Sequence, residues 1–239
     1  MHYILNPYYD SVFQYMMADQ TVAISFFNLL LPFEVKSISP IINNQSAEPI
    51  RSSVLRFDYV ADVIMENGKK NRMLIEVLKS NTKEKYKTEL LPSKGEIVKH
   101  YSKSYLRYYS ILVLGEILDN ITVPAYCAKD TFYNLKTREE IEISDSLLDI
   151  LVREFSVIQI SQITEFPETM NDQPIVNLLK LFQQAYKMSE DFPGKLILAI
   201  PDFHTLDNKD LENVLSRLEA GAKDSNLLAE IEKSERNVT

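Results

Sequence analysis

Three acidic residues have types and positions that suit metal chemistry: Asp10, Asp58 and Glu76. Asp10 falls in the first turn of an expected helix, and the other two fall on two strands that a hairpin joins. A hairpin brings residues of its two strands side by side on one sheet face. Two adjacent, partly buried carboxylates repel each other unless a divalent cation lies between them. The pattern predicts a site for Mg²⁺, or for another divalent cation such as Mn²⁺ or Ca²⁺.

Each of these acids also has an ordinary structural explanation. An acid near a helix N-terminus complements the helix dipole, and an acid on a strand commonly faces solvent. Asp62 is a rival for Asp58, because it lies four residues further on and therefore on the same strand face. The residues alone leave these alternatives open.

The elements that must position the acids can be read from the chain. Asn6-Pro7 is a helix start signal, and apolar residues at helical spacing predict a helix over 6–31 that can break at Asp19-Gln20. Strands are expected over 54–65 and 72–79, with Asn67-Gly68 as the hairpin turn between them. Further strands are expected over 108–118, 122–132 and 156–160, and further helices over 144–154, 174–188, 208–220 and 224–235. This order predicts an α/β core followed by a helical part.

Charge is distributed unevenly along the chain. The segment from Lys69 to Arg107 has eleven Lys or Arg and four acids, so it carries +7 and leaves −15 for the rest of a chain whose net charge is −8. Cations in this segment alternate with tyrosines such as Tyr86 and Tyr101, a combination that suits phosphates and bases. The alternative is a solvated helix face anchored by its tyrosines. The residues expected to contact nucleic acid are Lys83, Lys85, Lys87, Lys99, Lys103 and Arg107.

Composition excludes several classes of protein. Apolar residues make up 45% of the chain, which argues against global disorder. No apolar run reaches the roughly 18 residues that a membrane span needs, and the first residues lack the pattern of a secretory signal. The one cysteine, Cys127, cannot form an internal disulfide, and its strand setting predicts burial. We therefore expect a cytoplasmic protein without a membrane partner.

Several blocks of the chain resemble a known family of nucleases. NPYYDSVFQYMM (6–17) and RFDYVADVIMENGKKNRMLIEVLKS (56–80) are similar to signature blocks of the recombination-promoting nuclease and transposase group of PD-(D/E)XK nucleases. ILVLGEILDNITVPAYCAKDTFYNLKTREEI (111–141) and SRLEAGAKDSN (216–226) resemble later blocks in the same order. The resemblance implies a restriction-endonuclease-like fold. We expect a nuclease-like core over residues 1–165 and a helical extension over residues 166–239.

The resemblance also assigns roles to residues. Asp10, Asp58 and Glu76 match the three metal-binding acids of the family. Where the family has a helix lysine, this chain has Gln14, and Leu78 stands where the family has glutamine or the wider superfamily has lysine. Lys79 follows at once, but a shift of one residue puts a side chain on the other sheet face unless a bulge intervenes.

Two functions follow from these matches and departures. The first is a divalent-metal-dependent DNA endonuclease of mobile elements, recombination or phage defence, in which Lys79 or Gln14 partly replaces the missing group. The alternative is a catalytically degenerate relative that binds DNA or a protein as a regulator. DNA is the expected partner, and a homodimer stays open.

Overall fold

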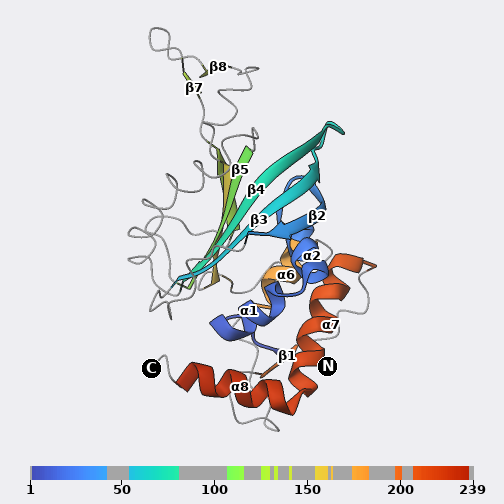
Figure 1. Ribbon diagram of the computed structural model, residues 1–239, viewed down its shortest axis with the longest axis vertical. Coiled ribbons are helices and arrows are strands. Elements are labelled where there is room, and N and C mark those ends of the chain that lie inside the picture. Colours follow the sequence, from blue (N-terminus) through green and yellow to red (C-terminus); the bar gives the residue numbers. More distant parts are fainter. Residues whose placement is uncertain are drawn as a thin grey trace. The chain divides into compact units, whose positions relative to one another are not determined.

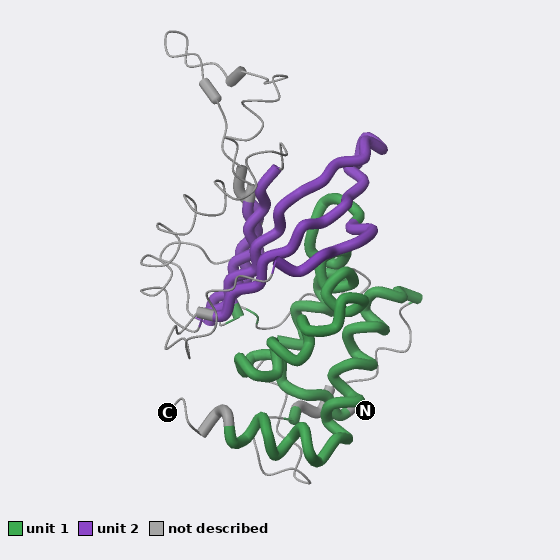
Figure 2. The backbone as a smooth tube through the Cα atoms, in the orientation of Figure 1, with its two compact units in different colours: residues 1–34, 160–239 green, residues 35–159 purple. Residues whose placement is uncertain are grey.

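The structure is a computed structural model. It divides into two compact units, one of residues 35–159 and one that joins residues 1–34 to residues 160–239 (Figure 2). The residues that it describes are 2–41, 54–80, 107–115, 125–129, 132–133, 140–141, 154–160, 163, 174–182, 197–200 and 207–236.

The unit of residues 35–159 contains a six-stranded mixed sheet with the strand order β2-β3-β4-β5-β9-β6. Figure 1 labels its strands β2, β3, β4 and β5. β3 and β4 are antiparallel, β4–β5 and β5–β9 are parallel, and β6–β9 is antiparallel. With the helices described below, this sheet confirms the expected α/β class. The strands are β2 (Glu34–Pro40), β3 (Val54–Ile64), β4 (Lys70–Ser80), β5 (Arg107–Leu114), β6 (Ala125–Lys129) and β9 (Glu154–Gln159), and a separate pair is formed by β7 (Phe132–Tyr133) and β8 (Glu140–Ile141).

The predicted hairpin turn sets the register of β3 against β4. Gly68 has a φ of 76°, which L-residues with a side chain rarely adopt. The Asn67 side chain accepts a hydrogen bond from the Lys69 N–H at 3.0 Å, and the Met65 N–H donates to the Lys69 carbonyl at 3.0 Å. Pairing then runs without a break from Ile64↔Lys70 to Val54↔Ser80. The hairpin prediction is confirmed.

β4 is buried continuously from Met73 to Ser80. A strand with parallel pairing in the middle of a sheet is commonly covered on both faces and so lacks polar alternation. One face of the sheet carries a core cluster of Leu78, Leu114 and Val157, with Leu112 and Phe155 packed against it. The two charged side chains in this buried part of the strand, Glu76 and Lys79, are therefore both fully buried.

The other unit is mainly helical. Its strands β1 (His2–Leu5) and β10 (Ile197–Ile200) pair antiparallel. Phe13 packs against Phe26 and Phe182 at ring-centroid distances of 5.8 and 6.2 Å, so residues far apart in sequence share one core. The helices are α1 (Asp10–Met17), α2 (Gln20–Leu30), α6 (Pro174–Lys180), α7 (Lys209–Lys223) and α8 (Ser225–Arg236).

Several local predictions need correction. The break at Asp19 is confirmed, since its side chain accepts from the Thr21 and Val22 N–H groups and caps α2. The first helix starts at Asp10 with Tyr9 as N-cap, because Asn6 instead accepts a hydrogen bond from the Tyr8 N–H. Cys127 is exposed, so its expected burial is wrong. The expected helix over 144–154 lies largely outside the described residues.

The compact units also divide the chain differently from the expected boundary at residue 165. The first helices share a unit with the C-terminal helices because α2 and β1 both pack on α7. Strands β1, β2 and β10 were not expected, since short strands with distant partners leave little periodicity in the sequence. Within the described ranges, no helix has the length and apolar character that a bilayer span requires.

Close packing at Gly221 of α7 gives a first test of the helical unit. A Cβ at this position would overlap Leu5 Cδ1 and lie 2.9 Å from Tyr15 Cε1. We expect Gly221→Ala to lower the free energy of unfolding, because overpacking costs about 1–3 kcal/mol and exceeds the gain of about 1 kcal/mol in helix propensity. Urea unfolding followed by circular dichroism measures the change. The control is Ser216→Ala, an exposed site of the same helix; equal stability of the two variants would contradict the packing.

Candidate functional site

Asp58 and Glu76 are direct cross-strand partners on the β3–β4 hairpin. Both side chains therefore leave the same face of the sheet, in the arrangement that the hairpin prediction requires. Asp58 is 6% exposed and Glu76 is fully buried. Two carboxylates at this depth need a cation or proton near them, because burial disfavours the charged form and each charge repels the other.

The cation beside both carboxylates is the guanidinium of Arg56. Its Nε donates to Asp58 Oδ1 and Oδ2 at 3.1 and 3.0 Å, and its Nη2 lies 2.9 Å from Glu76 Oε1. The second contact is an ion pair without hydrogen-bond geometry, since neither atom has a hydrogen-bond partner among the described residues. One guanidinium thus offsets one of the two negative charges and joins both acids.

The second oxygen of Glu76 accepts hydrogen bonds from β5. Tyr108 Oη donates to Glu76 Oε2, and Ser110 Oγ donates to the same oxygen at 3.3 Å. The parallel pairing of β4 with β5 sets this contact, because Ser110 is the register partner of Glu76. These donors hold the carboxylate in one orientation.

The pKa values follow from burial and from these charges. Burial raises the pKa of Glu76 above its ordinary value, although Arg56 and Tyr108 oppose the rise. Burial and the charge of Glu76 raise the pKa of Tyr108, so this phenol stays protonated and keeps donating. Burial acts to lower the pKa of Arg56, but Glu76 and Asp58 outweigh it and the net change is upward. Arg56 is therefore a permanent cation.

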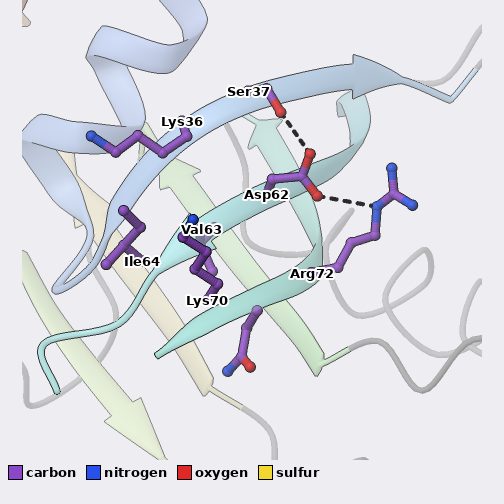
Figure 3. Close-up of a pocket in the computed structure, with 8 residues that line it drawn as sticks. Lys36, Ser37, Asp62, Val63, Ile64, Lys70 and Arg72 are labelled. Carbon is purple, nitrogen blue, oxygen red and sulfur yellow. Dashed lines mark hydrogen bonds and ion pairs between the residues drawn. The ribbon is translucent and has the colours of Figure 1, made fainter. Parts of the chain in front are cut away.

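Asp62, the rival of Asp58, belongs to a different pair. It accepts a hydrogen bond from Ser37 Oγ at 2.8 Å and lies 3.3 Å from Arg72 Nε, as Figure 3 shows. Its side chain is 55% exposed. The groove of about 730 Å³ beside it is lined by Lys36, Ser37, Asp62, Val63, Ile64, Lys70, Asn71 and Arg72 (Figure 3). This groove includes neither Asp58 nor Glu76, and the register places Asp58 opposite Glu76.

Lys79 does not join the carboxylate pair. The pairing of β4 with both neighbours continues through Lys79 without a bulge, at Leu55 on β3 and Val113 on β5. Lys79 therefore lies on the sheet face opposite to Glu76, where it is fully buried. Leu78 occupies the Glu76 face and packs into the core cluster.

The remaining predicted residues lie elsewhere. Asp10 is in the first turn of α1, and Gln14 is exposed one turn later. Both belong to the helical unit, so their convergence with the pair stays a prediction. Arg107 begins β5 opposite Met73. Five of the six predicted nucleic-acid contacts lie outside the described residues: Lys83, Lys85, Lys87, Lys99 and Lys103.

Two carboxylates of the predicted metal site, Asp58 and Glu76, come together within the sheet unit. No group of three or more His, Cys, Asp or Glu side chains in the described part of the chain is placed to hold a metal ion. Even so, Asp58 and Glu76 supply the hard oxygens that Mg²⁺ prefers. Glu76 Oε1 is buried without a hydrogen-bond donor among the described residues and lies 2.9 Å from Arg56 Nη2. The acid pair therefore fits a divalent cation that would replace Arg56 at this oxygen.

Sequence reasoning missed Arg56, Tyr108 and Ser110. Arg56 had a readable signal, because it stands two residues before Asp58 and thus on the same strand face. Tyr108 and Ser110 had none, since the parallel register of β5 against β4 is set by distant parts of the chain. No family model, curated protein or solved structure matches the chain. The resemblance to nucleases therefore stays a prediction.

Removing the guanidinium tests the electrostatics of this cluster. Glu76 binds its proton more tightly in the folded than in the unfolded chain, so its ionisation lowers stability as pH rises through the folded pKa. Arg56→Met leaves two buried carboxylates without their cation. We expect it to cost about 3 kcal/mol at pH 8, the lower end for breaking a buried pair because the Arg56 side chain is 26% exposed. Much of this loss should be recovered at pH 5, where a proton replaces the cation.

Chemical unfolding at the two pH values measures the effect. The matched control is Arg72→Met, which removes an arginine paired with an aspartate on the same sheet face but 61% exposed. It should change stability by less than about 1 kcal/mol at either pH. A loss for Arg56→Met that is equally large at pH 5 and pH 8 would show that carboxylate charge is not its cause.

Proposed function

We propose that the chain is a divalent-metal-dependent DNA endonuclease of the PD-(D/E)XK type. The observation that carries the proposal is the placement of Asp58 directly opposite Glu76, both buried, on a hairpin. These are the two strand acids that the nuclease resemblance assigns to the metal. Their pairing is what a shared cation site requires, and the exposed rival Asp62 does not have it.

The order of the strands supports a restriction-endonuclease-like core. An antiparallel hairpin carries the acids, and the next two strands of the sheet, β5 and β9, continue parallel to its second strand. The hairpin acids thus lie in the interior of the sheet, where β5 adds hydrogen-bond donors to Glu76. Fold similarity alone does not establish activity, so the proposal depends on the acids.

The chemistry divides between the metal and the chain. Mg²⁺ held by Asp58 and Glu76 would activate a water molecule and offset charge on the phosphate. Tyr108 and Ser110 fix Glu76 through its Oε2 and leave Oε1 against the Arg56 guanidinium. Burial excludes bulk water from the pair, which strengthens electrostatic interactions within it.

DNA is the substrate that the charge distribution favours. The segment from Lys69 to Arg107 carries +7 in a chain of net charge −8. A local basic segment can neutralise DNA phosphates even when the whole chain is acidic. The family that the chain resembles is associated with mobile elements, recombination and phage defence. We propose the same setting for this chain.

Nicking of supercoiled plasmid in Mg²⁺ tests this proposal. Asp58→Asn and Glu76→Gln keep the side-chain size but remove a metal-binding charge. The loss of several kcal/mol of transition-state stabilisation should slow cleavage by about 10²–10³-fold. EDTA should abolish cleavage by the unmodified chain. Asp62→Asn, on the same strand face but outside the pair, is the matched control and should cleave normally. Equal nicking by all four proteins would refute the assignment.

A second function is favoured by Leu78 and Lys79. An apolar side chain occupies the Glu76 face at the position of the catalytic lysine or glutamine, and Lys79 lies on the other face. A catalytically degenerate relative that binds DNA or a protein as a regulator would have this arrangement.

Restoring the missing groups separates the two functions. If the chain is degenerate, Leu78→Lys or Leu78→Gln, each combined with Gln14→Lys, should create cleavage of plasmid that the unmodified chain lacks. The expected gain is about 10²-fold or more, since one such donor contributes about 10²–10³ in rate. Circular dichroism checks that replacing buried Leu78 leaves the fold intact. An unmodified chain that already cuts as fast as the restored variants would exclude the degenerate function.

A further inference from the structure

Arg56 stands directly across the hairpin from Leu78. The two residues are register partners on β3 and β4, next to the Asp58↔Glu76 pair. Their side chains leave the same sheet face as the two acids. A cation is therefore present one strand away from the position at which the nuclease resemblance places a lysine or glutamine and this chain has leucine.

The contacts of Arg56 leave part of its guanidinium available. A guanidinium has five N–H donors in a planar fork. Nε and Nη2 face Asp58 and Glu76, whereas no residue that the structure describes accepts a hydrogen bond from Nη1 or pairs with it. The Arg56 side chain is 26% exposed, against 3% for Asp58 and 0% for Glu76. Arg56 is thus more accessible to solvent, or to a substrate, than either carboxylate.

Neither of the other candidate groups has such a position. Lys79 lies on the opposite sheet face, and Gln14 is neutral and belongs to the other unit. Arginine also suits the role chemically, because its fork matches phosphate oxygens and its charge persists at every working pH.

We propose that Arg56 is the catalytic cation of this site, and that it binds a non-bridging oxygen of the scissile phosphate in place of the absent lysine. The proposal rests on the endonuclease function proposed above. In the reaction, a water oxygen forms a new bond to phosphorus, one phosphate ester bond breaks, the water loses a proton and the leaving alkoxide gains one. Arg56 forms and breaks no covalent bond, and its permanent charge stabilises the negative charge that builds up on the phosphate oxygens.

Binding of DNA gives a readout that does not depend on cleavage. The probe is a fluorescent 24-base-pair duplex, titrated by anisotropy in Ca²⁺ at several KCl concentrations. Each phosphate contact contributes about 0.9 to the slope of log affinity against log salt concentration. We expect Arg56→Met to reduce the slope by about 0.9, whereas Arg56→Lys keeps the charge and the slope.

Cleavage by the same variants tests the catalytic part. Arg56→Met should lower the single-turnover rate of plasmid nicking by about 10²–10³-fold. Adding Leu78→Lys to Arg56→Met moves a cation across the hairpin to the register partner, and should recover at least about 10-fold of the lost rate. Lys36→Met, which removes an exposed cation on β2 of the same sheet but outside the basic segment 69–107, is the control for cleavage and should leave the rate unchanged.

The outcomes separate the two proposals. An unmodified chain that neither binds nor cuts DNA overturns the endonuclease function and this inference with it. If the unmodified chain cuts DNA and Arg56→Met cuts it at the same rate, only the role of Arg56 is overturned. This holds even if Arg56→Met has a smaller salt slope in DNA binding. If Arg56→Met does not fold, the slope of Arg56→Met/Glu76→Gln is compared with that of Glu76→Gln. Equal slopes in that pair overturn the phosphate contact, and a difference of about 0.9 supports it.

Discussion

The interaction on which the site depends is the contact of one guanidinium with two buried carboxylates. Asp58 and Glu76 face each other because the hairpin register requires it, and their mutual repulsion has to be balanced within the sheet. Arg56 supplies that balance from the same strand as Asp58, with ion-pair distances of 3.0 and 2.9 Å. A buried acid pair is costly without a compensating cation, so the sheet depends on the guanidinium that contacts both carboxylates.

The strand order explains how a buried strand can hold one carboxylate. β4 is buried continuously from Met73 to Ser80, and its parallel neighbour β5 places Tyr108 and Ser110 against Glu76. Every oxygen of the two carboxylates therefore contacts a donor or a cation. A divalent cation bound to these acids would compete with the Arg56 guanidinium for the same carboxylate oxygens.

Local signals in the sequence predicted the hairpin well and the cluster only in part. Asn67-Gly68 defines the turn, and strand alternation then puts Asp58 and Glu76 on one face, which is enough to pair them. The role of Arg56 could also have been read from its spacing to Asp58. By contrast, Ser110 meets Glu76 through a parallel pairing between strands separated by residues 81–106, and no local pattern encodes such a register. The pairing of β1 with β10 escaped prediction for the same reason.

The helical unit is made from the two ends of the sequence shown, with the whole sheet unit between them. Strand β1 pairs with β10 and α2 packs on α7, so these contacts of the first helices and strand form only after residues 197–223 have been synthesised. The hairpin that carries Asp58, Glu76 and Arg56 lies within residues 54–80. It is therefore complete along the chain before the partners of β1 and α2 have been synthesised.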